Sequence, residues 1–298
     1  MRHIRIAATV VGVAWAVSSA ASLWAQEGPI VAAPPGSTLH LVAPVAETLF
    51  QRGLGESRAA VIGVESHLFA DRMAAIYMGG VEGESWRNEV ARIHDPARVS
   101  ALLLAAIGQQ VQGRQIDTRL TSMLGATGAN SGPDGQGMIL AARIQLGQPA
   151  RLEALAQRMQ ADDARAAPVL VAIDEMIDEY DPVSAEMARN MNRQLAFVRG
   201  FAEADGFDFP TSPDDAAADL SLQSSELHAE ATVKIRLNWY AAYAPLGPAA
   251  VSRSAAVRAS PGMRALHALL ERAEDDVLAQ LAAETGRAAA RRMKGTPL

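Results

Sequence analysis

The fold is decided by residues 261–281, which read PGMRALHALLERAEDDVLAQL. Apolar residues recur there at steps of four, three, four and four positions, which places them on one face of a helix. Proline suits the first helical turn, so we expect the helix to begin at Pro261. The apolar face consists of Leu266, Leu270, Ala273, Val277 and Leu281. The other face of this helix carries Arg272, Glu274, Asp275 and Gln280.

The same periodicity extends over most of the chain, in segments rich in alanine, leucine, arginine and glutamate. Two pairs, Asp95-Pro96 and Asp181-Pro182, predict further helix starts, because aspartate caps free backbone N–H groups and proline occupies the first turn. We therefore predict an all-α, multi-helix bundle, either one unit or two diverged helical halves packed together. The apolar stripes flanking Asp181 are Leu170, Ile173, Met176 and Ile177 before it, and Met187, Met191, Leu195, Val198 and Phe201 after it.

Segments without this periodicity divide the chain. Glu27–Ser37 carries three prolines and predicts an extended leader. Five glycines in the segment Gly125–Gly137 predict a flexible loop, and the break at Asp205–Asp215 is a candidate boundary between halves. The predicted organisation is a signal peptide at 1–25, a flexible leader at 26–37 and a helical domain at 38–298, with candidate halves at 38–205 and 211–298.

The first 25 residues have the order of a secretory signal peptide. Arg2 and Arg5 precede an uncharged apolar run from Ile6 to Val17, and small residues follow down to Ala25. A membrane-spanning helix needs about 20 apolar residues, so we expect cleavage; an uncleaved inner-membrane anchor is the alternative. We therefore predict a periplasmic or secreted protein that contacts the membrane only through the signal peptide, before cleavage.

Composition disfavours several classes of function. The chain has no cysteine, which removes disulfides, thiolate metal sites and cysteine nucleophiles. Of its 27 basic residues, 25 remain without Arg2 and Arg5, against 33 acidic ones, a net charge of about −8 with neutral histidines. Nucleic acid and anionic lipid headgroups are poor partners for such a protein. The predicted partner is an envelope protein or an apolar ligand.

No motif assembles a catalytic or metal site. The glycine-rich loop lacks the Gly-Lys-Ser/Thr ending of a phosphate-binding loop. Asp174, Glu175, Asp178 and Glu179 share helix faces, but no Glu-x-x-His accompanies them, so we interpret this cluster as a solvated acidic face. Beyond the signal peptide, no two histidines lie within four residues of each other. We predict no catalytic residue, no metal and no cofactor.

The best candidate for a binding surface is the segment 235–243, which reads IRLNWYAAY. Aromatic rings beside an arginine are typical of recognition surfaces. The candidate ligand- or partner-binding residues are Arg236, Trp239, Tyr240 and Tyr243. The alternative is that the rings fill the core between alanine-rich helices.

Short blocks in the C-terminal region carry a family resemblance. They are YAAYAPLG at 240–247, SPGMRAL at 260–266 and GRAAARRM at 286–293, with IHDPAR at 93–98. These blocks resemble the bacterial envelope family called domain of unknown function 2059. Val257 stands where an aromatic residue is common in that family, and Met263 occupies the usual place of a glycine. The resemblance implies an exported, all-helical protein and brings no catalytic residues with it.

Two hypotheses of function follow. The first is a periplasmic binding or protein-interaction module of the cell envelope, whose grooves between helices receive a protein segment or an apolar ligand. The alternative is a periplasmic hydrolase whose site assembles Asp174 or Asp178 with His94 or His228. Convergence of these groups in a concave pocket would favour the hydrolase.

Overall fold

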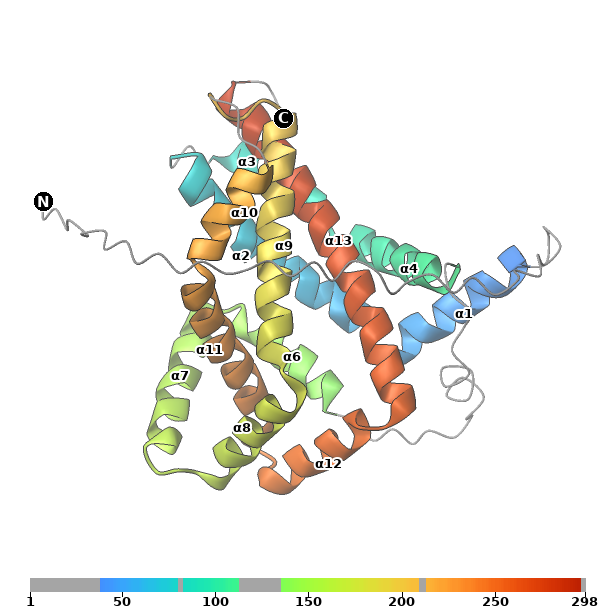
Figure 1. Ribbon diagram of the computed structural model, residues 1–298, viewed down its shortest axis with the longest axis vertical. Helices are drawn as coiled ribbons and strands as arrows, with labels where there is room; N and C mark the ends of the chain where they lie inside the picture. The colour runs from blue at the N-terminus through green and yellow to red at the C-terminus, as the bar shows by residue number, and fades with distance from the viewer. Residues whose placement is uncertain (1–37, 80–82, 113–134, 209–212, 296–298) are drawn as a thin grey trace, which may run out of the picture. The chain divides into compact units, whose positions relative to one another are not determined.

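The computed structural model describes residues 38–79, 83–112, 135–208 and 213–295, and the regular elements there are all α-helices, which confirms the predicted fold. Thr38–Leu298 form one compact unit. The predicted signal peptide and leader, and the glycine-rich loop as far as residue 134, lie outside the described residues. The helices (Figure 1) are α1 Thr38–Arg52, α2 Gly55–Tyr77, α3 Glu84–Ile93, α4 Pro96–Gln112, α6 Gln136–Leu146, α7 Pro149–Asp163, α8 Pro168–Tyr180, α9 Pro182–Glu203, α10 Pro213–Leu222, α11 Ser224–Tyr243, α12 Pro248–Arg258 and α13 Pro261–Met293.

Helix starts follow the local sequence closely. Before α4, the Asp95 carboxylate accepts a hydrogen bond from the Arg98 backbone N–H at 3.0 Å. Before α9, the Asp181 carboxylate accepts one from the Ser184 N–H at 3.2 Å. Both predicted Asp-Pro starts are therefore confirmed. The start of α13 at Pro261 is confirmed too, and all five residues of its predicted apolar stripe are buried.

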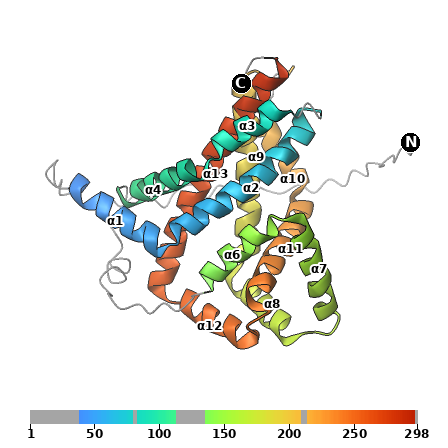
Figure 2. The same cartoon turned by 180° about the vertical axis from the view of Figure 1, so that it is seen from behind.

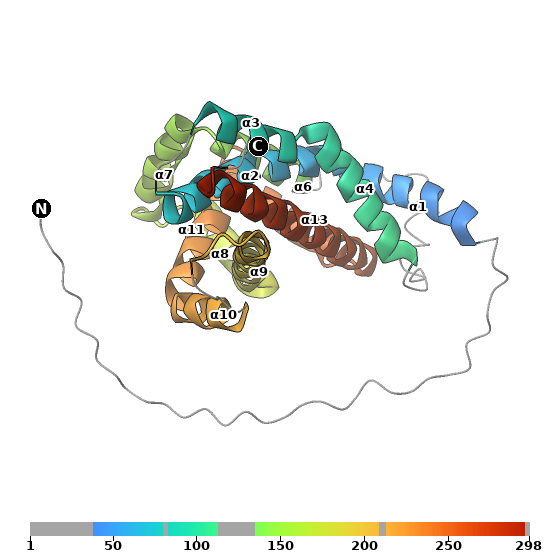
Figure 3. The ribbon, with the colours of Figure 1, turned by 90° about the horizontal axis from the view of Figure 1, so that it is seen from above.

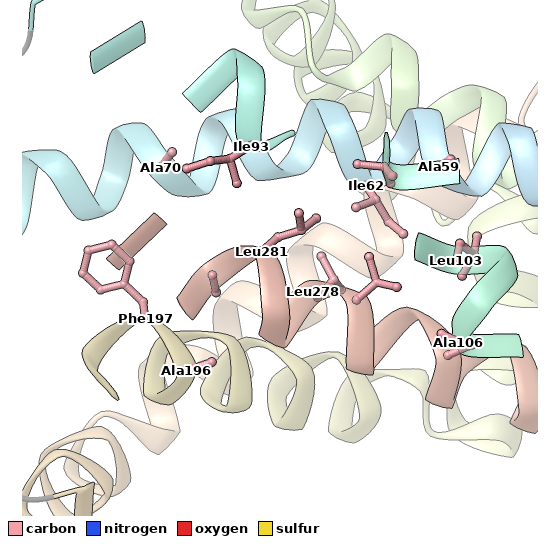
Figure 4. Close-up of a cluster of buried hydrophobic side chains, with 14 of the residues drawn as sticks. Ala59, Ile62, Ala70, Ile93, Leu103, Ala106, Ala196, Phe197, Leu278 and Leu281 are labelled. Atoms are coloured by element: carbon pink, nitrogen blue, oxygen red, sulfur yellow. The ribbon is translucent and has the colours of Figure 1, made fainter. Parts of the chain in front are cut away.

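Helix α13 lies at the centre of the first core. Figure 3 shows it between α9 on one side and α3 and α4 on the other, in agreement with their contacts. Figure 4 shows buried side chains from these helices and from α2 meeting around α13. They include Ile62 of α2, Ile93 of α3, Leu103 of α4, Phe197 of α9, and Leu278 and Leu281 of α13.

Two glycines let α9 and α13 approach closely. A Cβ atom at Gly200 would overlap the backbone of Ala283, and one at Gly286 would overlap the backbone of Phe197. Glycine is therefore required at this crossing, because neither backbone can move aside as a flexible side chain could.

The second core lies where α6, α8, α11 and α12 meet. Its largest buried side chains are Trp239, Tyr240 and Tyr243 of α11, which pack with Leu170 and Ile173 of α8. Both cores combine helices from the two sides of residues 205–211: α9 and α13 in the first core, α8 and α11 in the second.

Helices α13 and α9 bury charged side chains beside their apolar stripes. Glu274, outside the predicted stripe of α13, has a side chain that is 6% exposed and forms an ion pair with Arg58 of α2. On α9, Val198 is buried as expected, but Glu186 and Arg193 are buried as well. Met187, Met191 and Leu195 of the predicted stripe are only half-buried. In both helices, partners supplied by distant segments allow charged side chains to be buried.

Candidate functional site

The largest concave feature is a groove lined by residues of α2, α6, α7, α9 and α11, called the groove below. Figure 2 shows α6 between α2 and α11, and α6 contacts both. The groove has a volume of about 700 Å³, which lies within the range of about 300–1,000 Å³ for small-molecule sites. Its apolar lining includes Leu68, Phe69, Leu146, Leu152, Val233 and Leu237.

Helical spacing builds the groove's walls. On α11, lining residues recur three or four positions apart, from Glu226 through Glu230 and Val233 to Leu237, so they share one face. Leu68 of α2 is 52% exposed and Val233 is 59% exposed. Leu152 of α7, which lines the same groove, is 41% exposed. Large apolar side chains from three helices thus converge on one surface without being covered.

Ion pairs form the floor of the groove. The Glu65 carboxylate of α2 accepts a hydrogen bond from Arg143 Nε at 2.8 Å, and Lys234 Nζ lies 3.2 Å from it. Lys234 also donates to Glu186 of α9 at 2.5 Å. Burial by itself would raise the pKa of Glu65, but Arg143 and Lys234 outweigh it and hold that pKa well below its usual value.

Arg193 of α9 lies at the same floor and has different partners. Its side chain is largely buried, and Nη2 donates to the Glu65 carbonyl oxygen at 3.2 Å and to Ser66 Oγ at 3.0 Å. The guanidinium carbon lies 4.1 Å from the centre of the Phe69 ring, a cation–π contact. Burial lowers the pKa of Arg193 to about 10, so the side chain still carries its charge at pH 7.

Three of the four predicted binding residues lie in the second core. Trp239, Tyr240 and Tyr243 are at most 3% exposed. The Tyr240 hydroxyl donates to Asp162 at 2.5 Å, and the hydroxyls of Tyr243 and Ser254 lie 2.6 Å apart. These rings therefore offer little surface to a partner, and their packing matches the alternative interpretation as core anchors.

Arg236, the fourth predicted residue, reaches the surface and is bound to two carboxylates. Its guanidinium donates to Asp174 at 2.7 Å and 2.8 Å, and to Asp163 at 2.7 Å. These hydrogen bonds raise the pKa of Arg236. The bidentate pairs link α11 to α7 and α8, so Arg236 holds three helices together.

The groups of the proposed hydrolase lie on separate elements. His94 is buried after α3, with Nε2 3.3 Å from Thr285 Oγ1 of α13. Asp174 is bound to Arg236, which is eight residues, or about 12 Å of helix, from His228 on α11. Asp178 is exposed. Within the described ranges, no group of three histidine or carboxylate side chains is arranged to hold a metal ion.

Sequence reasoning did not find the groove. Two signals pointed to its floor: Lys234 is one of two lysines beside 25 arginines, and Glu65 interrupts the apolar run VIGVESHLFA at 61–70. Neither signal identifies a partner, because Glu65 and Lys234 are 169 residues apart in the chain. Only the packing of α6 against α2 and α11, and of α11 against α9, brings the ion pairs together.

Comparisons with known proteins give no relative for this chain: no family model, curated protein or solved structure matches it. The resemblance to domain of unknown function 2059 therefore stays a prediction. None of the helices in the described part of the chain is both long enough and apolar enough to cross a membrane.

Proposed function

We propose that this chain is an exported binding protein whose groove receives a small amphipathic molecule with an apolar chain. The observation that carries the proposal is the convergence of Leu68, Leu152 and Val233, all exposed, on one groove of about 700 Å³. Clustered apolar surface of this kind on a folded protein marks interaction sites far more than scattered exposed residues do.

The charged floor favours a small molecule over a protein segment. A partner helix needs a groove lined by a row of apolar anchors. Here the exposed apolar side chains, such as Val233, share the groove with the partly buried ion pair of Glu65 and Lys234. A ligand with one apolar end and one polar end matches both parts of this lining.

Export is the second part of the proposal, with the periplasm or the exterior as the place of action. It rests on the signal-peptide order of residues 1–25. Membership of the domain of unknown function 2059 family belongs to the same proposal, since that family implies an exported helical protein.

The test uses N-phenyl-1-naphthylamine, an uncharged apolar fluorophore that brightens in an apolar environment. Protein purified after expression of the full chain is titrated with the fluorophore. Val233→Trp fills the groove and is expected to weaken binding at least tenfold. Val171→Trp is the matched control, because Val171 is a 49% exposed valine on α8 that does not line the groove.

Three outcomes decide the proposal. Saturable binding that Val233→Trp weakens and Val171→Trp leaves unchanged supports it. Equal weakening by both variants would show that the fluorophore binds outside the groove, which contradicts the proposal. Absence of saturable binding to the wild-type protein overturns the proposal, as does capture of a protein through the groove with no binding of the fluorophore.

A further inference from the structure

The floor of the groove holds a cation, Arg193, that forms no salt bridge with a carboxylate in the described part of the chain. Arg193 donates hydrogen bonds to two neutral oxygens, the Glu65 carbonyl and Ser66 Oγ. Its Nε is buried and has no hydrogen-bond partner among the described residues. A buried, charged guanidinium with an unused donor costs folding free energy that an anion beside it would recover.

Neighbouring carboxylates are already engaged by other cations. Glu65 is paired with Arg143 and Lys234, and Glu186 is paired with Lys234 and Arg189. Arg189 also donates to Asp275 at 2.7 Å. Salt bridges thus join three acids, Glu65, Glu186 and Asp275, to three bases, Arg143, Arg189 and Lys234. Glu274 also attracts Arg143 and Arg189, but it has its own partner in Arg58. Arg193 is a further base beside them; Glu65 and Glu186 attract it without forming a salt bridge, so one positive charge remains in excess there.

The rim of the groove does not cancel this charge. Glu230 is bound to Arg72 at 2.6 Å, and both side chains are exposed. Glu226 is exposed as well, so water and salt screen its charge. The chain's net charge of −6 disfavours anions at long range, but that effect fades over about 10 Å at 0.1 M salt, whereas a buried charge is screened much less.

We infer that the groove binds a singly charged anionic amphiphile, a long-chain carboxylate, with its head at Arg193 and its chain along Leu68, Leu152 and Val233. This inference rests on the proposed function and names its ligand class. The planar guanidinium matches the geometry of a carboxylate. One surplus positive charge balances a monoanionic carboxylate, whereas a phosphate monoester would bring about two negative charges.

The experiment compares three ligands with the same twelve-carbon chain: dodecanoate, dodecanol and dodecylamine. Each displaces N-phenyl-1-naphthylamine from the protein, below its critical micelle concentration. We expect dodecanoate to bind about tenfold to a hundredfold more tightly than dodecanol, the range for a hydrogen bond between charged groups. Dodecylamine is expected to bind most weakly, because its charge repels Arg193.

Variants locate the head group. Arg193→Gln is expected to abolish the preference for dodecanoate over dodecanol. Arg193→Lys is expected to retain part of that preference, since it keeps the charge without the planar fork. Arg72→Gln is the control, because it removes a groove-lining cation that is exposed and paired. That control should keep the full preference.

Failure of the inference and failure of the proposed function are distinguishable. Equal affinity for dodecanoate and dodecanol overturns the inference and leaves an apolar binding protein. Preference for dodecylamine, or a preference for dodecanoate that persists in Arg193→Gln, also overturns it. If neither the fluorophore nor any of the three ligands binds, both the inference and the proposed function fail. The wild-type comparison decides the charge preference even if Arg193→Gln does not fold.

Discussion

Helices α11 and α13 bury their surfaces in different ways. Along α13 the buried residues are mostly small or aliphatic, and Gly286 brings the backbone of α9 into contact. On α11, Trp239 and its aromatic neighbours fill the second core, whereas Val233, six residues earlier, is 59% exposed beside the groove. Because small residues let α13 and α9 pack closely, no room for a ligand is left between them. The space for a ligand lies instead at the groove, where large side chains of α11 and α2 form the walls.

The largest expected effect contrasts the two faces of α11. Trp239→Ala is expected to lower the free energy of unfolding by about 3–5 kcal/mol, because it opens a cavity in the second core. Val233→Ala, on the exposed face, is expected to change it by less than about 0.5 kcal/mol. Urea denaturation measures both. Similar losses for the two variants would break the contrast between the core face and the groove face.

A pair of glycine substitutions tests the close approach of α13 to α9. Gly286→Ala is expected to cost about 3 kcal/mol, the upper end for overpacking, since the added Cβ meets backbone atoms. The control is Gly63→Ala inside α2, where the added Cβ would only touch the His94 carbonyl oxygen at 3.8 Å. There alanine is expected to stabilise the protein by about 0.4–1 kcal/mol. Thermal denaturation shows whether each variant is more or less stable than the wild-type protein. A change in the same direction for both variants would contradict the close packing at this crossing.

Mild acid is expected to lower the stability of the protein through two buried histidines near α13, and not through the ion pair of Glu65 at the groove floor. Burial lowers the pKa of His94, and that of His267 on α13, to about 3. In the unfolded chain their pKa is near 6.5, so below pH 6.5 the unfolded state binds protons that the folded state does not, and stability falls. The loss between pH 7.5 and 5.5 is about 1.4 kcal/mol for each histidine. The low pKa of Glu65 keeps its carboxylate charged over this range.

Urea denaturation of His94→Gln at the two pH values isolates this contribution. The variant is expected to lose about 1.4 kcal/mol less than the wild-type protein between pH 7.5 and 5.5. His228→Gln changes an exposed histidine and serves as the control. An unchanged pH dependence in His94→Gln would show that His94 is protonated without cost in the folded protein.

Local sequence was sufficient to predict the helices and several of their boundaries. The Asp95-Pro96 and Asp181-Pro182 starts and the apolar stripe of α13 depend on residues within one or a few turns. The burial of Glu274 did not follow from the helical pattern, because Arg58, 216 residues away, supplies its buried partner. Periodicity cannot reveal a partner so distant in the chain.

The candidate site shows the same limit more strongly. Aromatic composition drew attention to Trp239 and Tyr243, which share a helix face, yet that face points into the second core. The groove is lined instead by side chains from five helices, and its floor joins Glu65 to Lys234. The spacing of residues along the chain predicts neither the exposed face of α2 nor the excess positive charge at Arg193.

By itself, the sequence determined the all-α fold class, the cysteine-free reliance on packing and the start of helices such as α9 and α13, because capping and helical period act over a few residues. The tertiary structure alone decided which faces are covered. It placed three aromatic rings of α11 in a core, left Val233 exposed and buried Arg193 without a carboxylate partner among the described residues. The physical reason is that burial and charge compensation depend on neighbours more than a hundred residues apart in the chain.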